Sequence, residues 1–188
     1  MSAWHIVRRP GRTLRAFVLF GALIGICGSG VVCAQSPSGD AVAKAKFTIT
    51  LARFVQWPPG AFAGDAAPLR LCVLHSSPMV GAAFARYEGE QVAGHTVNVV
   101  SNPAIRSGCD LLFVDTSAAR AGAEAVRLAT GTPVLTLGAV DGFLSQGGMV
   151  ELANVDDALR FDVSLKTVRS AQLGLSSQVL KLARQVRD

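Results

Sequence analysis

The chain has 188 residues, of which half are hydrophobic and 16% are charged, as is typical of a globular protein with a substantial core. Its 18 Lys and Arg outnumber its 13 Asp and Glu, and a net charge of +5 suggests an acidic partner. Four of those cations lie in the first 15 residues, so residues 35–188 keep 14 cations against 13 acids, a net charge of +1. That balance excludes a phosphate backbone as the expected partner.

The N-terminus has the pattern of an export signal. Four arginines precede an apolar run over residues 16–26, and small residues follow up to Ala34. We therefore predict a secretory signal peptide over residues 1–34, cleaved near Ala34. The alternative is an uncleaved membrane anchor, because residues 16–34 approach the length of a spanning helix.

Removal of the signal peptide changes the cysteine count. Cys27 and Cys33 are lost, whereas Cys72 and Cys109 remain. In an oxidising compartment, two cysteines most simply form one disulfide. The alternative is a pair of buried free thiols.

We expect a polar linker over residues 35–42 and a folded domain over residues 43–188, with Asp40 as the cap of the first helix. Hydrophobic residues then recur at helical spacing from Phe47 to Trp57, and Pro58 ends that helix.

Strands and helices alternate along the next part of the chain. Apolar runs predict strands over 69–75, 96–100, 110–114 and 133–137, and helices are expected over 79–87 and from Ser117, as cap, to Ala129. This alternation predicts an α/β fold, a single domain with a mostly parallel twisted sheet and helices on both faces.

The pattern changes near the C-terminus. Residues 148–152 and 159–165, joined by a turn over 153–158, predict an antiparallel hairpin at the sheet edge. A hydrophobic stripe from Leu165 to Val186 predicts one closing helix. If the first and third strands are neighbours, Cys72 and Cys109 lie close enough for a disulfide, which stabilises the domain by about 3–4 kcal/mol.

The residues give no sign of a catalytic, metal or cofactor site. After the signal peptide there are two histidines, His75 and His95, and no metal-ligand or nucleophile motif is present. Gly147-Gly148 enters a strand, whereas a phosphate-binding loop leaves one. Asp115 follows a strand, but one acid is not a mechanism. We therefore expect a binding protein and not an enzyme.

Ordered segments along most of the chain resemble the YfiR-like periplasmic regulators. They are 54–58 (FVQWP), 71–74 (LCVL), 109–114 (CDLLFV), 134–137 (VLTL), Phe143 ahead of 147–150 (GGMV), 160–165 (RFDVSL), 174–177 (GLSS) and 180–183 (LKLA). The chain departs from the pattern at Ser164, where asparagine is common, and after removal of the signal peptide it lacks the second cysteine pair of some relatives.

The resemblance implies a periplasmic regulator that binds and inhibits the periplasmic part of an inner-membrane diguanylate cyclase, thereby controlling cyclic di-GMP and biofilm. It also implies an outer-membrane-associated partner that sequesters the regulator, a homodimer, and a bridge between Cys72 and Cys109.

Six residues form the candidate ligand or partner surface: Arg53, Gln56, Trp57, Arg160, Asp162 and Ser176. Trp57 is an anchor if exposed and core if buried. Arg160 and Asp162 share one face of a strand, as a recognition patch or as a solvated face.

Two other functions remain open. One is an exported module that senses an aromatic or amphipathic small molecule near Trp57. The other is an exported enzyme that uses Asp115 with His75 or His95, which requires hydrogen-bond reach between them.

Overall fold

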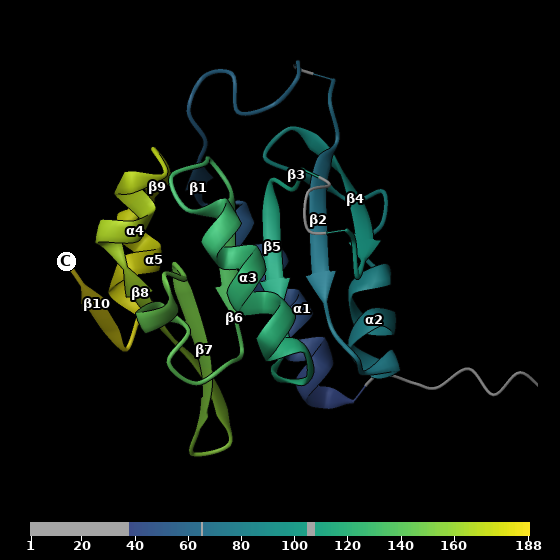
Figure 1. Cartoon of the computed structure of the whole chain (residues 1–188), viewed down its shortest axis with the longest axis vertical. Coiled ribbons are helices and arrows are strands. Elements are labelled where there is room, and N and C mark those ends of the chain that lie inside the picture. Colours follow the sequence, from purple (N-terminus) through teal and green to yellow (C-terminus); the bar gives the residue numbers. More distant parts are fainter. Residues whose placement is uncertain (1–37, 65, 105–107) are drawn as a thin grey trace, which may run out of the picture. The chain divides into compact units, whose positions relative to one another are not determined.

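The computed structural model describes residues 38–64, 66–104 and 108–188 (Figure 1). The predicted signal peptide therefore lies outside the described residues, as do residues 35–37 of the expected linker. No helix within the described ranges is long and apolar enough to cross a membrane.

The first helix begins earlier than expected. Helix α1 spans Gly39–Ala52, so four residues of the segment expected as a linker are helical. Its cap is Ser38, whose side chain accepts a hydrogen bond from the N–H of Ala41, and not Asp40. Asp40 instead pairs with Lys44 one turn later and accepts a hydrogen bond from Asn154. Both residues suit a helix N-terminus, but only Ser38 has the extended backbone of a cap.

Within the described residues, eight strands form one sheet in the order β10-β8-β7-β6-β5-β2-β4-β3. Their bounds are β2 (Leu69–Leu74), β3 (Gln91–Val92), β4 (His95–Ser101), β5 (Leu111–Val114), β6 (Leu135–Gly138), β7 (Val150–Val155), β8 (Ala158–Ser164) and β10 (Gln185–Arg187). All neighbours are parallel except β7 with β8 and β3 with β4. The largely parallel sheet confirms the predicted fold class.

Helices cover both faces of this sheet, as predicted (Figure 1). On one face, α1 and α2 (Pro78–Ala85) pack over alternate strand residues such as Leu71, Val73 and Phe113. On the other face, α3 (Ala119–Ala129) packs over Leu112 and Val114. Because side chains alternate along a strand, β5, which is apolar throughout, and β2, which is apolar except for Arg70, contribute to both cores.

The predicted disulfide is confirmed. Strand β2 pairs with β5 in parallel, so the first and third predicted strands are neighbours. Cys72 lies within β2 and Cys109 precedes β5, and their Cα atoms are 5.9 Å apart across the bond. The bond therefore fixes the loop before β5 to the middle of the sheet.

Ser117 is not the cap of the helix that follows β5. A short 3-10 turn, η1 (Thr116–Ala118), comes first, and its cap is Asp115, whose carboxylate accepts from the N–H of Ser117. The Ser117 hydroxyl donates to the same carboxylate at 2.5 Å. Asp115 takes this role because its backbone is extended and its carboxylate reaches the N–H of Ser117, two residues later.

The predicted hairpin is present as β7 and β8, with a tighter turn than expected. The strands run to Val155 and Ala158, so only Asp156 and Asp157 form the turn. Both have positive φ (50° and 59°), which is the backbone of a two-residue hairpin turn. The hairpin is not the last element of the sheet, because β10 pairs with β8 beyond it.

The prediction of a single closing helix over this segment is wrong. The segment forms α4 (Leu165–Ser170), β9 (Gly174–Leu175), α5 (Ser177–Leu182) and β10. Gln172 has a left-handed backbone (φ 59°) that ends the first helical segment. Ser176 then caps α5 by accepting from the N–H of Val179. Local backbone and capping therefore override the continuous hydrophobic stripe.

Candidate functional site

The site begins where α1 ends. Arg53 follows the last helical residue, and the N–H of Phe54 still bonds to the carbonyl of Leu51 at 2.9 Å. The chain then becomes extended as β1 (Val55–Gln56), and Pro58 and Pro59 follow after Trp57. Two consecutive prolines cannot continue a helix, so the chain turns away at this point.

Strand β1 pairs with β9, about 120 residues later in the chain, in a two-stranded antiparallel sheet. Val55 lies opposite Leu175, and Gln56 lies opposite Gly174. A Cβ at Gly174 would lie 2.9 Å from Oε1 of Gln56, so the glycine allows the close approach. The N–H of Ser176 also bonds to the carbonyl of Phe54 at 3.2 Å.

This arrangement brings together four of the six predicted surface residues. We call the surface formed by Arg53, Phe54, Gln56, Trp57 and Ser176 the β1–β9 corner. Phe54, which sequence reasoning did not select, is 39% exposed and is the large hydrophobic side chain of the corner that faces solvent most openly. Its position in the helical stripe made it a core candidate, but the helix ends before it.

An ion pair borders the corner. The guanidinium of Arg53 contacts the carboxylate of Glu90, which precedes β3, and both side chains are more than one-third exposed. Such an exposed pair contributes little to stability, typically below about 1 kcal/mol. It leaves a charged rim beside the exposed ring of Phe54.

Trp57 is half-buried and neither fully core nor fully surface. Its ring packs on Phe62 with ring centroids 5.6 Å apart, and Phe62 stacks on His95 at 3.9 Å. These three rings line part of a cavity of about 530 Å³. The indole Nε1 of Trp57 is buried and has no hydrogen-bond partner among the described residues. A buried donor without a partner is costly, so this one suits a ligand acceptor.

The other two predicted surface residues belong to the large sheet. Arg160 and Asp162 lie on β8, and Arg160 is exposed whereas Asp162 is only 2% exposed. The carboxylate of Asp162 accepts from Nε and Nη2 of Arg184 at 2.9 and 2.5 Å. These hydrogen bonds hold the pKa of Asp162 below its ordinary value. Asp162 therefore holds the C-terminal segment in place.

The residues of the enzyme hypothesis do not form a catalytic group in the described ranges. Asp115 is 4% exposed and is bonded to Ser117, not to a histidine. His95 bonds through Nδ1 to the carbonyl of Ala67, and the ring nitrogens of His75 are buried without partners among the described residues. The described ranges also contain no group of three His, Cys, Asp or Glu side chains placed to hold a metal.

Comparison with known proteins decides the family. A sequence profile for YfiR/HmsC-like proteins matches residues 41–184, almost all of the described chain. The chain belongs to the YfiR/HmsC-like family. This result confirms the resemblance drawn from the ordered segments, and the Cys72–Cys109 bond fits the exported proteins of this YfiR/HmsC-like group.

One solved structure supports the fold of this YfiR/HmsC-like chain. A conserved domain protein from Vibrio cholerae O1 biovar El Tor str. N16961 matches with a TM-score of 0.53 and 8% identity over 81% of this chain. The chain spans 62% of that protein's length. An ABC domain in complex with L-Trp, from Streptococcus pneumonia, matches with a TM-score of 0.48 and 15% identity, covering 76% of this chain and 60% of that one. No curated protein sequence matches the chain.

Proposed function

We propose that the chain is a periplasmic signalling regulator that binds and inhibits the periplasmic part of an inner-membrane diguanylate cyclase. It thereby lowers cyclic di-GMP and restrains biofilm formation. Membership of the YfiR/HmsC-like family and a disulfide that suits an exported protein support this proposal. The observation that carries the binding role is the exposed Phe54 at the β1–β9 corner.

Phe54 suits a partner contact because its surroundings are fixed before binding. The corner's backbone is held by the pairing of β1 with β9 and by the hydrogen bond from Ser176 to Phe54. A preorganised aromatic side chain loses little conformational entropy on binding, and such residues often dominate binding energy. The charged rim of Arg53 and Glu90 then provides the polar border that interfaces commonly have.

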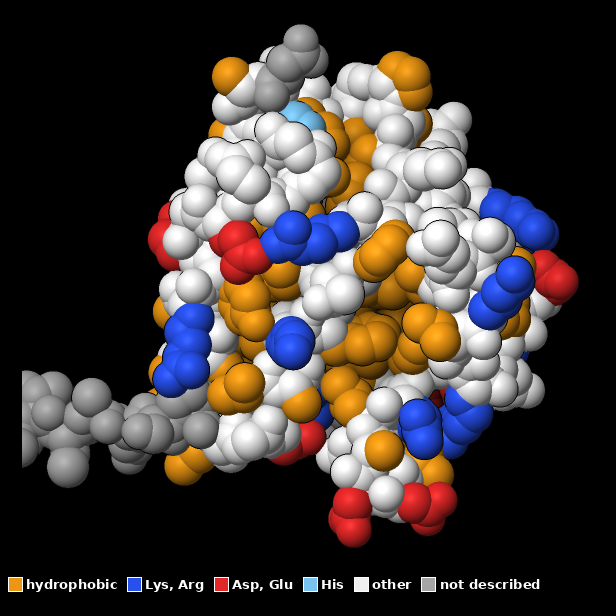
Figure 2. All heavy atoms as spheres, turned by 180° about the vertical axis from the view of Figure 1, so that it is seen from behind, with side chains coloured by type: hydrophobic (Ala, Val, Ile, Leu, Met, Phe, Trp, Pro, Cys, Tyr) orange, Lys and Arg blue, Asp and Glu red, His pale blue; other side chains and the backbone are white. Residues whose placement is uncertain are grey.

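Part of the face opposite α3, over α1 and the C-terminal segment but not over α2, extends this surface. Figure 2 shows hydrophobic side chains gathered in a hollowed band across that face, with Lys and Arg side chains at its borders. Half-buried hydrophobic residues of α1 and of the C-terminal segment, including Phe47, Leu175 and Leu180, pack against the core on this side. An apolar patch with a polar border is the usual mark of a protein interaction site. A homodimer contact and a sequestering outer-membrane-associated partner belong to the same proposal.

Co-purification with the periplasmic region of the cyclase tests the role of Phe54. We expect Phe54→Asp to weaken binding at least about tenfold, because it places a charge in an apolar contact. Met79→Asp is the matched control, since Met79 is also 39% exposed but lies on α2. Equal binding by wild type and Phe54→Asp would contradict the proposed surface.

The second candidate function is a sensor for an aromatic or amphipathic small molecule. It is favoured by the buried, unpartnered Nε1 of Trp57 in the wall of its cavity. Once residues 1–34 are removed, Trp57 is the only tryptophan, so its fluorescence reports on this site alone. We expect benzoate to change that fluorescence, and both benzoate and indole-3-acetate to raise the melting temperature.

The variant Trp57→Phe keeps a ring but removes the N–H donor. Under the sensor hypothesis it loses most of the thermal shift given by the carboxylates, because the acceptor then has no partner. A shift of the same size in wild type and variant would remove the indole N–H from the proposed recognition.

A further inference from the structure

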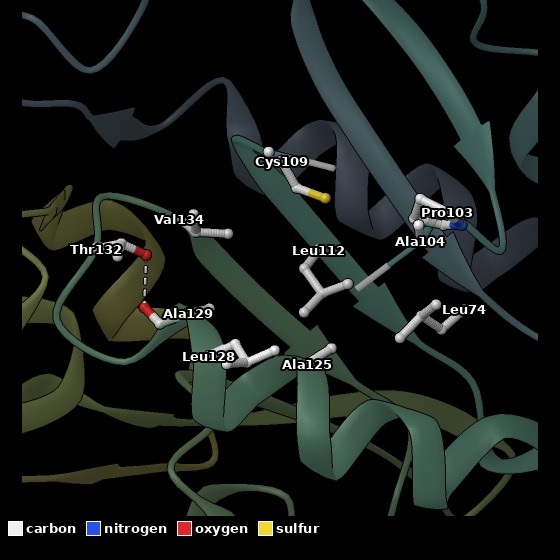
Figure 3. Close-up of a pocket in the computed structure, with 11 residues that line it drawn as sticks. Leu74, Pro103, Ala104, Cys109, Leu112, Ala125, Leu128, Ala129, Thr132 and Val134 are labelled. Carbon is white, nitrogen blue, oxygen red and sulfur yellow. Dashed lines mark hydrogen bonds between the residues drawn. The ribbon is translucent and has the colours of Figure 1, made fainter. Parts of the chain in front are cut away.

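A separate cavity of about 560 Å³ lies on the other face of the sheet, beneath α3 (Figure 3). Leu74 of β2 and Leu112 of β5 point from the sheet toward the helix, and Ala125 and Leu128 of α3 face them. Cys109, in the disulfide, and Val134 close the side near the start of β5 and β6. The volume is in the range of pockets that hold small molecules.

The described lining of this cavity is mostly aliphatic. Its described residues carry no charged side chain and no aromatic ring, and most are aliphatic. The single side-chain hydroxyl in that set belongs to Thr132, which donates to the carbonyl of Ala129 at 2.7 Å (Figure 3). The part of the wall that the structure describes therefore offers neither a stacking platform nor a free side-chain donor. Aliphatic hydrocarbon is the material that such walls bind best.

The walls are also held apart. At Gly122 the helix approaches β5 so closely that a Cβ would lie 2.1 Å from Cγ1 of Val114. One and two turns later, Ala125 and Ala129 have short side chains that leave a hollow above the sheet. The parallel ladders among β2, β5 and β6, together with the disulfide, prevent the sheet from closing it. Apolar guests gain free energy by leaving water for such an aliphatic hollow.

We propose that this cavity binds one unbranched aliphatic chain, as carried by a fatty acid or a phospholipid. Leu128, 40% exposed, lies at the opening, so the polar end of the molecule remains in water while the hydrocarbon is buried. The site lies on the face opposite α1, and it does not depend on the proposed binding of a cyclase.

Isothermal titration of the oxidised protein with straight-chain alcohols from hexanol to tetradecanol tests the proposal. We expect the affinity to rise about fourfold for each added methylene until the cavity is full, and then to level off. The matching fatty acids should show the same slope, because the described lining is uncharged. A lysophospholipid arm distinguishes a membrane lipid from a free acid by which one binds more tightly.

Ala125→Leu fills the cavity and should reduce the affinity at least about tenfold. The matched control is Ala123→Leu, which changes a half-buried alanine of the same helix outside the lining. If Ala125→Leu fails to fold, Leu128→Gln replaces an exposed residue at the opening and should weaken binding several-fold. Absence of binding at every chain length, or equal weakening by both alanine variants, would overturn the proposal.

Discussion

For single residues, alternation along a strand predicts which side chains share a face of the sheet, but it does not predict which of them are exposed. Residue spacing correctly placed Arg160 and Asp162 on one strand, but only Arg160 is exposed. The partner of Asp162 is Arg184, which follows α5 and precedes β10. Because the sequence predicted a continuous helix there, it gave no reason to bring Arg184 to this strand. Asp162 is thus part of a structural ion pair with Arg184 and is not part of an open recognition patch.

This ion pair should contribute to stability in a pH-dependent way. The folded pKa of Asp162 is lowered by the hydrogen bonds from Arg184, so the contribution is present above the unfolded pKa of about 3.9. It is lost as the pH falls through the lower, folded pKa. We expect Arg184→Gln to reduce the free energy of unfolding at neutral pH, and to reduce it much less near pH 2.

Urea denaturation at the two pH values measures this difference. Arg169→Gln is the control, because its partner Asp188 is 77% exposed and that pair should contribute below about 1 kcal/mol. A loss for Arg184→Gln that is independent of pH would show that the charge of Asp162 is not what the arginine stabilises.

At the level of elements, the strands were the most predictable part. Continuous apolar runs identified β2 and β5 because both faces of these strands are buried. The closing helix failed because helical periodicity continues through residues that cannot all be helical. Gln172 with its left-handed backbone and Ser176 as a cap interrupt it. Such local preferences are weak in a sequence window and decisive in the folded chain.

At the contact between α3 and β5, helix propensity and packing predict opposite effects of Gly122→Ala on stability. Alanine is a better helix former than glycine by about 1 kcal/mol, so propensity alone predicts that Gly122→Ala stabilises the protein. The close approach of Val114 predicts the opposite, a loss of about 1–3 kcal/mol. Thermal unfolding decides between them. Gly39→Ala in α1, where no atom lies within 4 Å of a new Cβ, should instead be neutral or slightly stabilising.

The disulfide joins two elements that are neighbours in space and 37 residues apart in the chain. In the chain-entropy model such a bond stabilises the folded state by about 3–4 kcal/mol. We expect the double variant Cys72→Ala and Cys109→Ala to unfold at correspondingly lower urea concentration. Addition of a reductant should lower the midpoint of the wild type and leave that of the variant unchanged; equal midpoints for both proteins under oxidising conditions would contradict this prediction.

At the scale of the whole molecule, the sequence predicted the fold class and two pairs of neighbouring strands, β2 with β5 and β7 with β8. The rest of the strand order depends on contacts between distant segments, such as β10 with β8. The β1–β9 corner is of this kind, because Gln56 pairs with Gly174, which lies far away in the sequence. Sequence reasoning therefore selected four residues of the corner singly, without a reason to place them together, and it missed Phe54.

The intracellular concentration of cyclic di-GMP tests the central claim most directly. It is measured in cells that lack the chain and in cells that regain the wild type, Phe54→Asp or Met79→Asp. We predict that loss of the chain raises cyclic di-GMP, that wild type and Met79→Asp restore the low level, and that Phe54→Asp does not. An unchanged concentration after loss of the chain would contradict the proposed inhibition of a diguanylate cyclase.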